Sequence, residues 1–395
     1  MKSKLFYTLF IGLIFLVIGC TDDSKMNEEP LTNEDEPLAN EGETSPFIPS
    51  VDVSDLEIEG RIEQIYYAHD NNLIISADKL YLFDTKKGQI LNAVPKEDFQ
   101  EEKFSIIDNG YVAVRNKINS QSGNIMMTDG DITTEAVFYN KNLETVSQFD
   151  FNQLFENSNT FLLLDGITFS SDGKQMAYAT SLGLYLYNFD TGNNSRIIDL
   201  ASEDLKARSG IINFEKVSFT EDNQRLAFKG QSFDIPVTEN SVSFDTCGIV
   251  NTNGSILMNE KYSSFNCKRL TAYNDVLLYT EDPSAASGKT LVMDIPSTES
   301  KVYNLKDKKE SGNVFGSNTG EYFATSVITE TGWIVRIYNM ETGELEAEQQ
   351  ISNEGVTRYM EHDPIIFVMD DTRTFFVLLG SKQDDMETKL IANPF

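Results

Sequence analysis

The chain is short of the residue types on which most catalytic and cofactor sites depend. Its 395 residues include two histidines, three cysteines and a single tryptophan, Trp333. Lysine and arginine together number only 32, against 62 aspartates and glutamates, so the net charge is −30. Nucleic acids and anionic headgroups are bound through clustered basic residues. This balance therefore excludes DNA, RNA and lipid headgroups as expected partners.

Sequence signatures of common active sites are absent as well. There is no Gly-x-Ser-x-Gly nucleophile elbow and no Gly-x-x-x-x-Gly-Lys-Ser/Thr phosphate loop. No Cys-x-x-Cys pair occurs, and neither His69 nor His362 lies near Cys247 or Cys267 in the sequence. A Cys/His metal site is therefore not expected. The sequence predicts no metal, no cofactor and no catalytic residue.

Long apolar runs are missing, apart from one near the N-terminus. Residues 5–18 follow two lysines and would span about 21 Å as a helix, short of the roughly 30 Å hydrocarbon core of a membrane. The segment is therefore typical of a cleaved signal peptide. It is followed by Gly19 and Cys20, and Val17-Ile-Gly-Cys20 resembles the lipobox of bacterial lipoproteins. The resemblance implies removal of residues 1–19 and lipidation of Cys20.

A lipidated Cys20 implies an extracytoplasmic protein anchored to the cell membrane or the outer membrane. Residues 20–50 contain nine acidic residues and one lysine. Such a segment has too little apolar surface to offset the entropy of ordering, so we interpret it as an acidic disordered tether. Acidic residues directly after the lipidated cysteine also resemble the export tag of some surface lipoproteins. A location on the cell surface therefore stays open.

From residue 51 to residue 395, short runs of β-branched, aromatic and aliphatic residues alternate with turns rich in Asp, Asn, Gly and Ser. This pattern predicts an all-β fold. The clearest unit runs from Ile167 through Asp172-Gly173 to Leu184-Tyr-Leu-Tyr-Asn and Thr191-Gly192. It resembles the repeat of TolB-type, WD-like β-propellers, and the resemblance implies a propeller domain over residues 51–395.

Hairpins of this kind recur about every 50 residues, which suits one four-stranded propeller blade. We expect them to begin near Ile65, Phe104, Ile167, Val217, Leu270, Val314 and Ile365. Seven blades are predicted, with six or eight as alternatives. The last unit ends after its third strand, near Lys389 to Ala392. We therefore expect an N-terminal segment between Val53 and Ile58 to supply the missing outer strand and close the ring.

Beside the anchor, Cys247 and Cys267 are the only cysteines, and they lie on either side of an Asn253-Gly254 turn. An oxidising compartment would permit a disulfide between them. The alternative is two buried free thiols.

Candidate contact residues are expected where connections enter the inner strands, because these connections surround the central channel. His362 and Asp363 occupy such a connection, whereas His69 is expected in a turn after an inner strand, at the opposite end. Two long insertions, residues 116–134 and 229–242, are further candidates, since propeller loops vary while the blades are constrained. We expect them to form a contact surface.

The predicted function is that of a membrane-anchored extracytoplasmic lipoprotein whose β-propeller is a protein-interaction or ligand-binding module. Lipid on Cys20 would hold it to the membrane, and its partner would be an envelope protein or an extracellular ligand. The alternative is a propeller enzyme of the glycosidase or lyase type that uses carboxylates at the channel rim. The sequence leaves the oligomeric state open.

Overall fold

A computed structural model of the protein describes residues 51–52, 57–96, 101–118, 132–155, 162–238, 240–260, 265–273, 275–281, 287–310, 314–352, 364–379 and 389–395. The predicted signal peptide and tether lie outside these residues. Within them, no helix combines the length and apolarity needed to cross a membrane.

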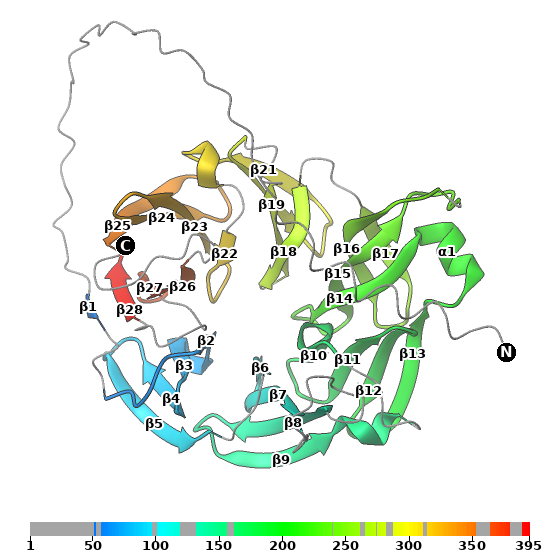
Figure 1. Ribbon diagram of the computed structural model, residues 1–395, viewed down its shortest axis with the longest axis horizontal. Helices are drawn as coiled ribbons and strands as arrows, with labels where there is room; N and C mark the ends of the chain where they lie inside the picture. The colour runs from blue at the N-terminus through cyan, green and yellow to red at the C-terminus, as the bar shows by residue number, and fades with distance from the viewer. Residues whose placement is uncertain are drawn as a thin grey trace, which may run out of the picture. The chain divides into compact units, whose positions relative to one another are not determined.

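Short antiparallel strands make up almost all of the regular structure. They form seven four-stranded sheets, the blades, which follow one another around a common centre (Figure 1). Blade 1 contains β2 (Gln64–Tyr67), β3 (Asn72–Ser76), β4 (Lys79–Asp84) and β5 (Gln89–Pro95). Blade 2 contains β6 (Glu101–Ile107), β7 (Gly110–Ile118), β8 (Ile132–Asn140) and β9 (Thr145–Asp150). Blade 3 contains β10 (Ile167–Phe169), β11 (Gln175–Thr180), β12 (Gly183–Asn188) and β13 (Asn193–Asp199).

The remaining blades follow the same order from the inner to the outer strand. Blade 4 contains β14 (Ile211–Phe219), β15 (Arg225–Phe233), β16 (Ser243–Asn251) and β17 (Ile256–Glu260). Blade 5 contains β18 (Phe265–Tyr273), β19 (Val276–Glu281), β20 (Lys289–Asp294) and β21 (Ser300–Asn304). Blade 6 contains β22 (Val314–Gly316), β23 (Tyr322–Thr329), β24 (Gly332–Asn339) and β25 (Leu345–Ser352). Blade 7 contains β26 (Ile365–Met369), β27 (Thr374–Leu379), β28 (Lys389–Pro394) and β1 (Val51–Asp52).

The predicted all-β, seven-bladed propeller is therefore confirmed. Each of the seven expected hairpin starts lies within the first strand of a blade. Alternate turns of each meander lie at opposite ends of the blade. We call the end with the first and third turns the turn face, and the end with the second turns and the blade-to-blade connections the connection face.

The ring is closed by an N-terminal strand, as predicted, although its position differs from the expected one. The pairing partner of β28 is β1, with Val51 opposite Ala392 and Asp52 opposite Ile391. The closing strand thus lies just before the expected segment, of which residues 53–56 are outside the described residues. The hydrophobic pattern alone did not set this register, because it depends on where the distant C-terminal strand ends.

The core lies between neighbouring blades. One buried cluster joins blades 7 and 1 through side chains that include Ile62, Ile65, Phe83, Phe376 and Leu390. The other clusters each join two consecutive blades in the same way. Packing therefore continues around the whole ring, as in other repeat architectures that bury each unit against its neighbours.

The aromatic residues of the repeat have a packing role. The ring of Phe149 in blade 2 lies 5.2 Å from that of Tyr187 in blade 3. Phe138 in blade 2 packs edge-on against Phe169 and Phe189 of blade 3. Alternate side chains of each strand thus fill the space between two sheets.

Asp172 has the predicted turn role. Its Oδ1 accepts hydrogen bonds from the Ser170 hydroxyl at 2.6 Å and the Lys174 amide at 3.0 Å, which hold the pKa of this carboxyl below its usual range. The intervening Gly173 has a φ of +68°, a value that favours glycine. Blade 4 repeats the arrangement with Thr220 and Asp222.

The helical segments of the described residues are short. They are η3 (His69–Asn71), η4 (Phe151–Leu154), η5 (Leu164–Gly166), α1 (Glu203–Ser209) and η6 (Lys308–Glu310). All but η3, which lies in the first turn of blade 1, belong to blade-to-blade connections. The sequence pattern did not reveal α1, although its signals are present. The Ser202 hydroxyl accepts a hydrogen bond from the Leu205 amide at 3.3 Å, and Gly210 ends the helix with a φ of +67°.

Candidate interaction surface

Most of the residues singled out from the sequence as contact or lipidation sites lie outside the described residues. This holds for Cys20, His362 and Asp363. His69 lies in the turn after β2, as expected, and is half-buried. Its Nε2 atom contacts the carbonyl oxygens of Ile107 at 2.7 Å and Gly110 at 3.0 Å. The imidazole therefore joins the turns of blades 1 and 2.

Cys247 is fully buried in β16, in the core between blades 4 and 5. It takes part in a disulfide. The strand β18, which contains Cys267, packs against β16. The side chain of Cys267 is outside the described residues, so its pairing with Cys247 stays a prediction. Such a bond would join the third strand of blade 4 to the inner strand of blade 5.

We expect peptide mapping of the non-reduced protein to recover the peptides of Cys247 and Cys267 as one linked species that separates on reduction. Cross-linking a loop of this size stabilises a protein by about 3 kcal/mol in the chain-entropy model, so reduction should also lower the melting temperature. The Cys247→Ser/Cys267→Ser variant should melt at the lower temperature with or without reductant. Recovery of both peptides as free thiols would contradict the pairing.

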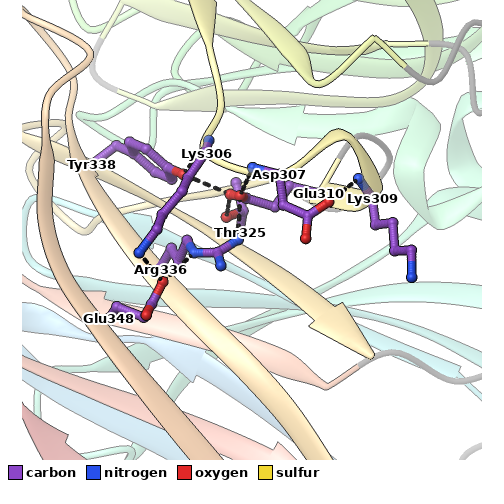
Figure 2. A network of polar contacts seen from close by, with 8 residues as sticks. All are labelled: Lys306, Asp307, Lys309, Glu310, Thr325, Arg336, Tyr338 and Glu348. Carbon is purple, nitrogen blue, oxygen red and sulfur yellow. Dashed lines mark hydrogen bonds and ion pairs between the residues drawn. The ribbon is translucent and has the colours of Figure 1, made fainter. Parts of the chain in front are cut away.

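Two buried ionic networks could be mistaken for catalytic sites. In blade 6, Glu310 accepts hydrogen bonds from the hydroxyls of Thr325 at 2.6 Å and Tyr338 at 2.7 Å (Figure 2). It also pairs with the guanidinium of Arg336, whose Nε lies 2.6 Å from Glu348. In blade 2, Arg115 pairs with Glu102 and donates to the Tyr139 hydroxyl. Apart from the exposed Glu348 the groups are buried, and all of them are bound to one another, so we assign them a structural role.

The buried Lys103 could also be mistaken for a catalytic residue, because its pKa is perturbed. Burial lowers the pKa of its ammonium to about 8, while Asp165 acts in the opposite direction. Perturbed pKa values are common at functional sites. Here, however, Nζ donates to the carbonyl oxygens of Leu164 at 3.3 Å and Ile167 at 3.0 Å, and lies 3.7 Å from Asp165. The ammonium therefore fastens β6 of blade 2 to the connection that enters blade 3.

Blade 4 departs most clearly from the repeat. Its second turn is long, and the helix α1 precedes its first strand. Asn259 on β17 donates to the Ser209 carbonyl at 2.6 Å and accepts from the Thr246 hydroxyl at 2.6 Å. These bonds fix the end of α1 against the outer strand. The Phe233 amide donates to the Gly210 carbonyl at 2.8 Å, so the long turn begins from an anchored position.

The long turn presents apolar side chains to solvent. Ile235 is 51% exposed and Val242 is 79% exposed, while Val237 and Leu257 are also exposed. Ile235 and Leu257 line a cavity of about 400 Å³, together with residues of α1 and β17. We call Ile235, Val237, Val242, Leu257 and this cavity the blade-4 surface. It includes part of the insertion 229–242 that the sequence nominated as a contact surface.

The geometry defines a class of protein, a WD40-like seven-bladed β-propeller with a closed ring, and its described residues include an apolar surface on blade 4. No protein-family model matches the chain, and no curated protein matches it. Among solved structures, it is similar to the β-propeller domain of Cps50 (Swd1) from Myceliophteria thermophila, with a TM-score of 0.51. The two chains are 10% identical, and the match covers 87% of this chain and 98% of the other. This likeness shows the fold alone.

Proposed function

We propose that the protein is a lipid-anchored, extracytoplasmic β-propeller that binds another envelope protein through the blade-4 surface. The observation that carries the proposal is the exposure of Ile235, Val237 and Val242 in one long turn and of Leu257 on β17, with Ile235 and Leu257 lining a cavity. Grouped exposed apolar side chains on a protein surface are typical of contact sites. The lipobox-like Val17-Ile-Gly-Cys20 supports the anchor, and the TolB-type likeness of the repeat supports an extracytoplasmic setting.

The rigid ring supplies the mechanism. Interblade packing and the closing strand fix the blade, and hydrogen bonds from Asn259 and Phe233 fix the two ends of the surface. The surface would therefore lose little conformational entropy when a partner binds, which favours affinity. The ring would be presented at a distance from the membrane by the acidic segment, as the sequence predicts.

Site-specific photo-crosslinking in cells that make the full-length protein tests this proposal. A photoreactive residue at Val242 should give one discrete cross-linked protein in the membrane fraction. The same residue at Val146, which is 67% exposed on β9, should give none. Adding Ile235→Asp to the Val242 probe should abolish the product, because a charge in the apolar contact would have to be desolvated.

The anchor is tested in the same cells with Cys20→Ser. We expect this variant to lose incorporation of labelled fatty acid and to leave the membrane fraction, with the propeller still folded. Equal cross-linking from Val242 and Val146 would overturn the interaction surface. Fatty-acid incorporation that persists in Cys20→Ser would overturn the anchor.

A further inference from the structure

A second surface lies on the turn face, at the seam between blades 5 and 6. It is a groove of about 720 Å³, within the size range of ligand sites. Its wall on blade 5 comes from β19, β20 and β21, and its wall on blade 6 from the first and third turns of that blade. Apolar side chains line its base, and these are Val276, Val292, Met340 and the half-buried ring of Tyr303.

The wall formed by Tyr303 is fixed in place. The Tyr303 hydroxyl donates to the carbonyl oxygens of Met340 at 3.1 Å and Glu341 at 2.6 Å, so it crosses the seam. Its ring lies on Gly343, where a Cβ atom would be 2.2 Å from Cδ1 of Tyr303. Gly343 also has a φ of +72°, so both space and conformation favour glycine in this turn. The groove is therefore a preformed feature of the seam.

Charge is distributed unevenly around the groove. Four exposed acids surround it, namely Asp294, Glu299, Glu321 and Glu341, against a single base, Lys301. The Lys301 ammonium donates to the carbonyl oxygen of Glu341 at 3.3 Å and forms no ion pair among the residues that the structure describes. A lysine side chain thus already lies along the groove, with its ammonium on a main-chain oxygen. With four carboxylates and one ammonium, the lining of the groove has an excess of three negative charges.

A bound metal ion does not fit this arrangement. Within the described ranges, no group of three or more His, Cys, Asp or Glu side chains is close enough to hold one. The four carboxylates instead line a groove whose other lining residues include apolar side chains. Such a groove is complementary to a chain that alternates cationic and apolar side chains, because carboxylates bind ammonium and guanidinium groups while the base covers aliphatic carbon.

We propose that the groove between blades 5 and 6 is a docking site for a polypeptide segment of a partner that presents Lys or Arg side chains. The proposal concerns a different surface from the one on blade 4 and does not depend on it. Electrostatic complementarity would supply specificity and a high association rate, and the apolar base would supply contact area. The blade-4 surface and the groove could then hold two parts of the same assembly or two separate partners.

Binding can be measured by fluorescence polarisation with the full-length protein in detergent. The probe is a labelled seven-residue peptide that carries three lysines separated by glycine and valine. We expect it to bind, and the same peptide with acetylated lysines not to bind. The groove variant Glu321→Gln/Glu341→Gln should weaken binding by at least about tenfold, because two charge-assisted contacts are lost.

The matched control is Asp190→Asn/Glu203→Gln, which removes the same charge from exposed positions on blade 3 and α1. It should change the dissociation constant by less than about twofold, since these charges are screened at physiological salt. A second variant, Ser300→Arg, places a guanidinium in the groove and should block the peptide. Equal weakening by the two double variants, or full binding to Ser300→Arg, would overturn the proposal. Binding of spermine but not of the peptide would overturn it as well.

Discussion

Replacing Glu310 by alanine is expected to lower the free energy of unfolding by about 3 to 5 kcal/mol, because it removes one partner of a buried ion pair. Glu310 is 1% exposed and comes from η6, the connection between blades 5 and 6. It also accepts a hydrogen bond from the Asp307 amide at 2.6 Å. Its loss would leave two buried hydroxyls without this acceptor and would leave the guanidinium of Arg336 paired with Glu348 alone (Figure 2).

Urea unfolding followed by tryptophan fluorescence measures this effect. Trp333 is the single tryptophan of the chain, is 3% exposed and lies on β24 of the same blade as Arg336. The control is Lys306→Ala, which removes an ion pair with Glu348 at the edge of the same network. That pair is partly exposed, so its loss should cost less than about 1 kcal/mol. If both variants unfold at the same urea concentration, the network is not a stability element.

Deleting residues 51–60 is expected to lower the melting temperature by on the order of 5 to 10 °C, if each kcal/mol is worth a few degrees in a domain of this size. The deletion removes β1, which is hydrogen-bonded to β28, and Ile58, which packs on the core between blades 7 and 1. It also removes Glu59, whose amide donates to the Tyr81 hydroxyl at 2.8 Å.

The control is deletion of residues 21–45, the acidic segment that the sequence predicts to be a tether. It should leave the melting temperature unchanged to within about 1 °C, since so polar a segment has little apolar surface to bury. Calorimetry of the two proteins at equal concentration makes the comparison. Equal shifts would show that ring closure does not depend on the N-terminal strand.

Much of the fold could be predicted because its signals are local. The unit from Ile167 to Gly192 contains its own strand alternation and its own turn residues, and each repetition predicts another blade. The bonds of Asp172 to Ser170 and Lys174 span only two residues. Such short-range chemistry is visible in a sequence wherever it occurs.

The candidate surfaces could be predicted only in part. The length of the insertion 229–242 pointed to blade 4, but the length alone did not show that Ile235 and Val242 are exposed. The groove between blades 5 and 6 had no sequence signal, because its walls come from turns that lie between about 20 and 65 residues apart, brought together by the closed ring. Nothing in the sequence distinguishes Glu310 from the other acidic residues, which total 62 with it, so its burial could not be predicted.

The sequence by itself determined that the chain is built from repeated antiparallel meanders and where each begins, and it favoured seven of them while leaving six or eight open. The tertiary structure decided which charged groups are buried, which strand closes the ring and that a groove lies at the seam between blades 5 and 6. The physical reason is the sequence separation of the interacting residues. Strands and turns depend on residues that are close along the chain. Glu310 with Arg336, β1 with β28 and Tyr303 with Met340 are each far apart along the chain and meet only in the folded ring.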